Sequence, residues 1–294
     1  MEISFDFFSP EQILDHPLSK VKKVEVSIKR DDMIHPFISG NKWRKLKYIL
    51  LKARGEQKNH LVTFGGAWSN HLLATACAAA QFQFQCTGYV RGEQVENPVL
   101  SLCRLFGMNI HFVNREEYTN KEAIYAKHHD VDSSAFFIDE GGFSLEATKG
   151  CEEIITELKG KYDHVFVACG TGTTIAGIAK GAAKFCPAMK VHGVPVLKGG
   201  EFVKKVVMDL GSESPVILHT SYHFGGYAKT KPELIDFVKG FCTKTGIMIE
   251  PVYTGKLFYA VMDLMSKNYF KENERILIVH SGGLTGFLGH HLKF

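Results

Sequence analysis

Residues 24–53 read VEVSIKRDDMIHPFISGNKWRKLKYILLKA and predict a strand followed by a helix. Apolar and polar residues alternate over residues 24–28, a period of two that is typical of a half-buried strand. From Asn41 the apolar spacing changes to that of a helix, and Asn41 itself is a good N-cap residue. Lys42 is therefore expected in the first helical turn, where unpaired N–H groups and burial favour a neutral, nucleophilic amine. The alternative is that Lys42 lies on a basic, solvated helix face together with Arg44, Lys45 and Lys47.

The composition predicts a globular protein that resides in a reducing compartment. The chain has 294 residues, of which 45% are hydrophobic and 22% charged, and its formal net charge of +4 is too small and dispersed to predict nucleic-acid binding. Its 7 cysteines form no Cys-x-x-Cys pair, so we expect neither a disulfide framework nor a structural zinc, and a cytoplasmic location. Residues 1–14 do not resemble a secretory signal, and polar residues interrupt the uncharged stretch 60–90, so we expect no membrane span.

The rest of the chain alternates between strand and helix patterns. The sequence predicts helices at residues 69–82, 98–106, 115–128, 145–158, 175–185, 202–210 and 232–245. Such alternation is typical of α/β proteins, in which helices cover both faces of a largely parallel sheet. The strands predicted with them lie at residues 61–64, 84–90, 108–113, 135–138, 164–168, 191–196, 216–219 and 276–279.

Residues 169–174, CGTGTT, connect a predicted strand to a predicted helix. Glycines let the backbone N–H groups of such a loop converge, threonine hydroxyls add donors, and the N-terminus of the helix favours an anion. We therefore predict a phosphate site, with an ordinary strand-to-helix turn as the alternative. The dinucleotide fingerprint Gly-x-Gly-x-x-Gly is absent because Ile175 stands at its third glycine, which disfavours a nucleotide-dependent oxidoreductase.

A glycine-serine stretch and two histidine pairs are further candidates for functional sites. Gly65-Gly66 and then Ser69-Asn70 follow a predicted strand, where open α/β sheets bind ligands, although a glycine turn with a serine cap explains them equally well. The histidine pairs at 128–129 and 290–291 have no cysteine or carboxylate at metal-ligand spacing. We expect both pairs to be solvated surface, and we expect no metal site.

Five motifs follow one another along the chain: KRDD (29–32) with GNKWRK (40–45), GG (65–66) with SNH (69–71), GTGTT (170–174), PVYTGK (251–256) and HSGG (280–283). In this order they resemble the motifs of fold-type II pyridoxal-phosphate enzymes, specifically the group containing 1-aminocyclopropane-1-carboxylate (ACC) deaminase and D-cysteine desulfhydrase. The resemblance covers nearly the whole chain. It implies two domains of the tryptophan synthase β type, with residues 1–45 and 150–294 forming a large domain and residues 46–149 a small α/β domain.

The resemblance implies that the cofactor is pyridoxal 5'-phosphate and that Lys42 binds it as a Schiff base and later acts as a base. It implies that Asn70 hydrogen-bonds the phenolic oxygen of the cofactor ring and that Ser69 meets the substrate carboxylate. The expected partners are a small amino-acid substrate and a second copy of the chain, without nucleic acid or membrane. The implied phosphate-binding residues are Gly170, Thr171, Gly172, Thr173 and Thr174.

Four more residues match positions around the cofactor ring in this family. Tyr253 and Tyr227 match active-site tyrosines, and the alternative for each is a tyrosine that anchors the start of a helix. Ser281, with Thr254 beside it, is the expected partner of the pyridine nitrogen. ACC deaminases carry Leu and Glu at these two positions, and neutral hydroxyls suit substrates with a good β leaving group, so both departures favour the D-cysteine desulfhydrase pattern.

We therefore expect a pyridoxal-phosphate-dependent lyase that converts D-cysteine into pyruvate, sulfide and ammonia by β-elimination. The alternative reaction is the deaminase activity that opens the ring of ACC to give 2-oxobutanoate and ammonia, and a non-catalytic pyridoxal-phosphate carrier is the alternative from another class. Trp68 replaces the glutamine that usually precedes Ser-Asn, and Leu73-Ala74 stands where Arg-Gln often follows. These departures predict a modified substrate pocket.

Overall fold

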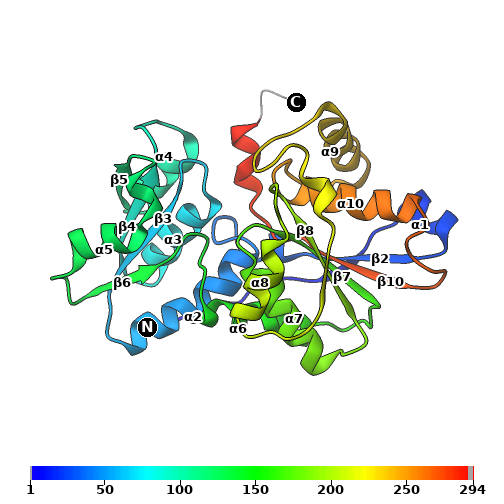
Figure 1. Ribbon diagram of the computed structural model, residues 1–294, viewed down its shortest axis with the longest axis horizontal. Coiled ribbons are helices and arrows are strands. Elements are labelled where there is room, and N and C mark those ends of the chain that lie inside the picture. Colours follow the sequence, from blue (N-terminus) through cyan, green and yellow to red (C-terminus); the bar gives the residue numbers. More distant parts are fainter. Residues whose placement is uncertain (1, 291–293) are drawn as a thin grey trace.

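The computed structural model describes residues 2–290 and 294, which form two lobes, each built on its own sheet (Figure 1). The strands of the larger sheet follow the order β1-β2-β10-β7-β8-β9. Neighbours in this sheet are parallel, apart from the antiparallel pair of β1 and β2. The strands are β1 (Glu11–Ile13), β2 (Glu25–Lys29), β7 (His164–Cys169), β8 (Lys190–Pro195), β9 (Val216–Leu218) and β10 (Arg275–Val279).

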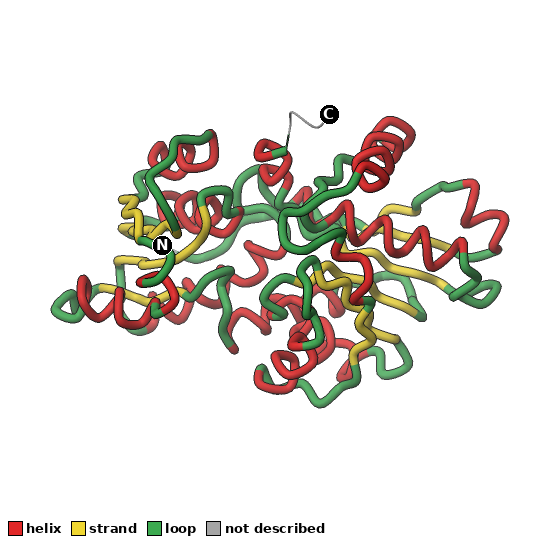
Figure 2. The backbone as a smooth tube through the Cα atoms, turned by 45° about the horizontal axis from the view of Figure 1, so that its top comes forward, coloured by secondary structure: helices red, strands yellow, loops and turns green. Residues whose placement is uncertain are grey.

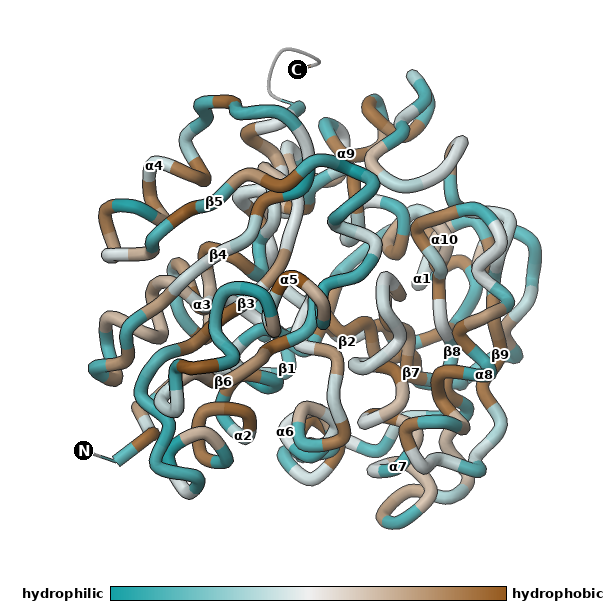
Figure 3. Tube along the Cα trace, turned by 60° about the vertical axis from the view of Figure 1, so that its left-hand side comes forward, coloured by the Kyte–Doolittle hydropathy of each residue, from teal (hydrophilic) through white to brown (hydrophobic). Residues whose placement is uncertain are grey.

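The smaller sheet has the order β5-β4-β3-β6, and all its neighbours are parallel. Leu61, Val62 and Phe64 of its central strand β3 are fully buried, because helices cover both faces of the sheet. In Figure 3 hydrophobic colour occurs on strands such as β6 and β7 and on parts of the helices, and many of the peripheral loops are hydrophilic. The strands are β3 (His60–Gly66), β4 (Gln85–Arg91), β5 (Asn109–Val113) and β6 (Ala135–Ile138).

Helices surround both sheets (Figure 2), and none within the described residues is long and apolar enough to cross a membrane. Four short 3-10 helices accompany them: η1 (Asp31–Met33), η2 (Glu117–Thr119), η3 (Thr220–His223) and η4 (Leu284–Gly289). The α-helices are α1 (Pro17–Lys22), α2 (Asn41–Gly55), α3 (Asn70–Gln81), α4 (Pro98–Leu105), α5 (Lys121–His129), α6 (Leu145–Thr156), α7 (Thr173–Phe185), α8 (Phe202–Asp209), α9 (Pro232–Thr245) and α10 (Thr254–Ser266).

Helices α2 and α6 pack against each other where the two lobes meet. They approach most closely at Gly150, where a Cβ atom would lie 1.8 Å from the carbonyl oxygen of Arg44, so only glycine fits. The chain enters the small lobe through α2 and returns through α6, and both domain boundaries expected from the sequence fall inside these helices. The position of α2 is therefore set by both lobes.

Three local expectations differ from the structure. The N-cap of α2 is Gly40 rather than Asn41, because the chain turns there with φ +60° and a Cβ would lie 1.8 Å from the Ser281 carbonyl oxygen. The single helix predicted over 115–128 is divided, since Asn120 accepts a hydrogen bond from the backbone N–H of Ala123 and starts α5 anew. The edge strand β1 and the short helix α1 were not anticipated.

Candidate active site

The amine of Lys42 lies in the first turn of α2 and has no hydrogen-bond partner among the described residues. Burial of the side chain, with the nearby charge of Lys45 as a smaller cause, lowers its pKa well below the usual value. A lowered pKa favours the neutral amine, which can act as a nucleophile or a base. It faces a small pocket lined by Pro36, Phe37, Ser39, Asn70, Gly283, Leu284 and Thr285.

A buried ionic network fixes the helix that carries Lys42. The guanidinium of Arg44 pairs with Asp31 through contacts of 2.8 and 3.1 Å and also binds Glu157, to which Lys29 donates at 3.0 Å. The neighbouring Lys45 donates to the carbonyl of Gly141 at 2.9 Å. Because Arg44 and Lys45 are only 1% and 3% exposed, the alternative of a solvated basic face is wrong for these two residues. The basic motif holds α2 in place.

The loop that follows β7 presents unpaired donors at the start of α7. Its N-cap, Gly172, has φ +92° and no side-chain cap, so the first-turn N–H groups are available to an anion. Asn41 of α2 donates to the Thr174 hydroxyl at 3.0 Å, which ties this loop to the Lys42 helix. At Gly170 a Cβ would lie 3.2 Å from the ring of Tyr253. The loop therefore has the arrangement of donors that a phosphate site requires.

Ser69 and Asn70 begin α3, and they use their side chains differently. The Ser69 hydroxyl oxygen accepts hydrogen bonds from the N–H groups of His71 and Leu72, at 3.2 and 3.3 Å, so it is the N-cap. Its own proton remains available to an acceptor outside the helix. Asn70 lines the Lys42 pocket, and its carbonyl oxygen accepts a hydrogen bond from the hydroxyl of Thr285.

The segment that contains Thr285 closes over α3 from the C-terminal side of the chain, where η4 lies between the two lobes in Figure 1. At Gly289 a Cβ would lie 3.2 Å from the indole of Trp68. Trp68, one of the departures from the family pattern, therefore packs on η4 beside the site.

Tyr253 and Tyr227 meet edge to face, with ring centroids 6.0 Å apart. Burial raises the pKa of Tyr253 well above its usual value, so its phenol remains protonated throughout the physiological range. Tyr253 immediately precedes α10, while Tyr227 follows η3 and keeps 50% of its surface exposed. The structure therefore brings the two predicted tyrosines together beside the phosphate loop.

Glu250 is a residue of this site that sequence reasoning did not identify. Its carboxylate is fully buried and accepts hydrogen bonds from the N–H groups of Val252, Tyr253 and Thr254, at 2.7, 2.7 and 2.9 Å. Burial raises the pKa of Glu250, and these three hydrogen bonds oppose the increase. A useful signal in the sequence was an acidic residue between the apolar run 247–249 and a helix start.

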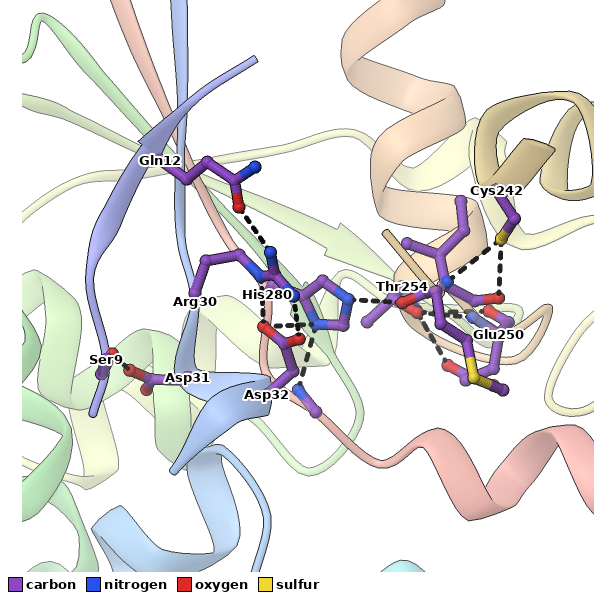
Figure 4. Close-up of polar contacts among 12 residues, drawn as sticks. Ser9, Gln12, Arg30, Asp31, Asp32, Cys242, Glu250, Thr254 and His280 are labelled. Carbon is purple, nitrogen blue, oxygen red and sulfur yellow. Dashed lines mark hydrogen bonds and ion pairs between the residues drawn. The ribbon is translucent and has the colours of Figure 1, made fainter. Parts of the chain in front are cut away.

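The two hydroxyl residues expected near the pyridine nitrogen have different surroundings. Thr254 accepts from the N–H of Glu250 at 2.8 Å, and its hydroxyl lies 3.4 Å from a carboxylate oxygen of that residue (Figure 4). Ser281 is buried, its carbonyl accepts the N–H of Asn41 at 3.2 Å, and its hydroxyl has no hydrogen-bond partner within the described part of the chain. Ser281 is therefore the freer of the two hydroxyls.

His280 connects the last motif to the first. Its Nε2 atom donates to the carbonyl of Met248 at 2.8 Å, and its Nδ1 atom lies 3.7 Å from Asp32, which pairs with Arg30 (Figure 4). Burial lowers the pKa of His280. The KRDD and HSGG motifs, far apart in sequence, thus meet because β2 and β10 are parallel neighbours.

Lys256 is the last residue of the PVYTGK motif, and sequence reasoning assigned it no role. Its buried amine donates to the carbonyls of Val196, His223 and Gly226 at 3.0, 2.9 and 2.8 Å. Burial lowers its pKa to about 8. These three bonds attach the loop that precedes Tyr227 to the end of β8 and to α10.

The histidine pair 128–129 is not uniformly solvated. His128 is exposed, but His129 is half-buried and lies close to His60 and to the carboxylate of Asp132, so the expected absence of a carboxylate partner is wrong. The fold, rather than sequence spacing, brings these residues together. In the other pair His290 is half-buried, and His291 lies outside the described residues.

Comparison with known proteins identifies the family. A model of the family "Pyridoxal-phosphate dependent enzyme" matches residues 12–282. A bifunctional D-cysteine desulfhydrase/ACC deaminase of Arabidopsis thaliana, named as mitochondrial, is 32% identical over 89% of this chain and 73% of its own length. A putative ACC deaminase of Pyrococcus horikoshii is 30% identical over 95% of this chain and 90% of its own.

Solved structures agree with this assignment. The crystal structure of an ACC deaminase homologue superimposes with a TM-score of 0.85 at 28% identity, covering 100% of this chain and 94% of the other. A processed threonine deaminase of Solanum lycopersicum, with a TM-score of 0.70 at 18% identity, shares the fold. The expected fold class and cofactor are confirmed. The chain is therefore an α/β protein of fold type II and a member of the pyridoxal-phosphate-dependent enzyme family.

Proposed function

We propose that this enzyme catalyses β-elimination from a small D-amino acid with a good leaving group, with D-cysteine as the substrate and pyruvate, sulfide and ammonia as products. The observation that carries the proposal is the environment of Thr254 and Ser281. The Thr254 hydroxyl lies 3.4 Å from the buried carboxylate of Glu250, where the Glu of ACC deaminases would place a second carboxylate against the first. The site is thus built for neutral groups.

Pyridoxal phosphate, when bound, withdraws electrons from Cα of the substrate. The first-turn N–H groups of α7, with the hydroxyls of Thr171, Thr173 and Thr174, would hold its phosphate. Glycine is favoured at Gly170, where a Cβ would lie 3.2 Å from the Tyr253 ring, and at Gly172, which has φ +92° and where a Cβ would lie 2.7 Å from Val206. Asn70 would hydrogen-bond the phenolic oxygen of its ring, and Ser281 the pyridine nitrogen.

Lys42 supplies the amine that binds the cofactor and then accepts the proton from Cα of the substrate. Its depressed pKa makes the neutral form available for both tasks. As the Cβ–S bond breaks, the sulfur takes the bonding electrons. Tyr253 keeps its proton and can donate it to the sulfur, and the ring of Tyr227 contacts the ring of Tyr253. The free proton of the capping Ser69 hydroxyl is available to the substrate carboxylate. Released aminoacrylate hydrolyses in water to pyruvate and ammonia.

Ring opening of ACC is the second candidate. ACC has no proton on Cα, so this reaction requires a group that acts on the ring, and Ser69 and Tyr253 both lie at the site. The names of the Arabidopsis and Pyrococcus relatives support this candidate. A non-catalytic carrier would need only Lys42 and the phosphate loop, and the presence of the other groups argues against it.

We also propose a homodimer in a reducing compartment, the cytoplasm, with neither nucleic acid nor a membrane as partner. The family resemblance supports the dimer, and the 7 free cysteines support the compartment. The domain division at residues 45/46 and 149/150 is supported by the strands, since β3 to β6 lie between these boundaries and the other strands outside them. Light scattering of the purified protein would test the dimer.

The functional test is incubation of the cofactor-loaded protein with D-cysteine, L-cysteine, D-serine and ACC in separate reactions, followed by assays for sulfide, ammonia and the keto acid. We expect sulfide and pyruvate from D-cysteine, with far slower turnover of the other three compounds. 2-Oxobutanoate from ACC as the dominant product would favour the second candidate. Inactivity toward all four compounds, with the cofactor spectrum intact, would refute both.

A further inference from the structure

A group of imidazoles and one carboxylate lies on the small lobe, outside the active site described above. His60 begins β3, His129 ends α5, and Asp132 lies in the turn that leads to β6. One candidate ligand atom from each of these residues lies within 4.8 Å of the other two. All three side chains are partly buried, so they are accessible to an ion from solvent.

The second layer of contacts orients these side chains. The Nε2 atom of His60 lies 2.9 Å from the buried Thr87 hydroxyl, which leaves Nδ1 facing an oxygen of Asp132 at 2.7 Å. The Nε2 atom of His129 lies 3.0 Å from the buried Tyr89 hydroxyl. The bond from His60 to Thr87 uses the imidazole nitrogen that does not face Asp132, and a bond of this kind is the usual support of a histidine ligand.

The carboxylate of Asp132 is also held in place. Its Oδ1 atom accepts hydrogen bonds from the N–H and the hydroxyl of Ser134, at 2.9 and 2.6 Å, and its Oδ2 atom faces His60. Ser134 and His60 therefore fix the orientation of this carboxylate.

We propose that His60, His129 and Asp132 form a binding site for a divalent transition-metal ion, with Zn²⁺ as the expected occupant. Two imidazoles and a carboxylate match the ligand preference of zinc, which binds such atoms at about 2.0–2.2 Å in a tetrahedral arrangement. The ligand atoms of one such ion are about 3.3 Å apart. His60 and Asp132 would therefore separate by about 0.6 Å from their present contact, and the His129 nitrogen, which lies within 4.8 Å of both, would approach by up to about 1.5 Å. The fourth position is left to water.

An ion at this position would connect three elements: β3, α5 and the turn before β6. The pairing of β3 with β6 brings the first and the last of these together. The site is independent of the proposed reaction, since it lies on the small sheet and contains none of the residues that contact cofactor or substrate. Its expected effect is to stabilise the small lobe.

The test uses the cofactor-loaded full chain, treated with EDTA and transferred to metal-free buffer. Titration with ZnCl₂ by calorimetry is expected to give one saturable site per chain, and CoCl₂ is expected to give the visible absorption of a tetrahedral ion. His129→Gln and Asp132→Asn should each weaken zinc binding by on the order of 100-fold or more. The matched control is His128→Gln, which removes the adjacent exposed histidine and should bind zinc as the unmodified chain does.

The proposal is overturned if the unmodified chain shows no saturable binding, or if His129→Gln binds zinc as tightly as His128→Gln. A measurement without variants covers the case in which a substitution prevents folding. Anomalous X-ray scattering at the zinc edge, from crystals of the unmodified protein soaked in ZnCl₂, should give a peak between His60, His129 and Asp132. Peaks confined to other positions would overturn the proposal.

Discussion

Replacement of Glu250 tests how the structure positions Tyr253. The carboxylate accepts three backbone N–H bonds at the start of α10, and it is fully buried. Glu250→Ala leaves all three donors unpaired in the interior, and about 1–1.5 kcal/mol for each gives a loss of about 4 kcal/mol in the free energy of unfolding. Glu250→Gln keeps one acceptor oxygen for two of the donors, and we expect a loss of about 2 kcal/mol.

The assay is urea unfolding of the cofactor-loaded protein, followed by circular dichroism. The matched control is Glu233→Ala, which removes an exposed glutamate from the first turn of α9 and should change stability by less than about 0.5 kcal/mol. Turnover of D-cysteine by Glu250→Gln should also fall, because Tyr253 loses its fixed backbone position. Equal stabilities for Glu250→Ala and Glu233→Ala would refute the reasoning.

Three further perturbations follow from the structure. Burial lowers the pKa of His192 to about 2 and that of His219 to about 4, whereas both take up protons near pH 6.5 in the unfolded chain. As the pH falls from 6.5 to 4, each histidine should therefore lower the free energy of unfolding by about 1.4 kcal/mol per pH unit. Equal free energies of unfolding at pH 7 and pH 5 would contradict this. Gly150→Ala places a Cβ against a carbonyl of α2, so it should lower the free energy of unfolding by about 1–3 kcal/mol and weaken cofactor binding. Gly240→Ala, which has no atom nearby, should change neither quantity when both variants are compared by urea unfolding and cofactor titration. Ser281→Ala should lower kcat for D-cysteine by about tenfold through loss of one hydrogen bond while cofactor absorbance is retained, and unaltered kcat would argue against its contact with the ring.

Much of the architecture was predictable because parallel strands buried on both faces leave continuous apolar runs in the sequence. The strands β3, β4, β7, β8 and β10 and the helices between them lie within a few residues of their predicted positions. The edge strand β1 is three residues long, none of its residues is buried, and only Ile13 is apolar, so no apolar pattern reveals it.

The site was predictable only to the extent that its residues occur in recognisable motifs. Lys42 and the phosphate loop follow local rules about helix N-termini, which can be read from a short stretch. Glu250 binds the N–H groups of residues 252–254, and these groups are unpaired only because α10 begins at Thr254. His60 and Asp132 come together through the pairing of β3 with β6, so their spacing in the sequence does not predict that they are neighbours.

The central claim is that the amine of Lys42, held at the start of α2, binds the cofactor. The most direct measurement is reduction of the cofactor-loaded protein with borohydride, followed by proteolysis and mass spectrometry of the labelled peptide. The account predicts a single pyridoxyl group on Lys42, loss of the label and of visible absorbance in Lys42→Ala, and retention of both in Lys47→Ala, which changes a partly exposed lysine of the same helix. A label on any other lysine, or a labelled Lys42→Ala protein with unchanged absorbance, would contradict the account.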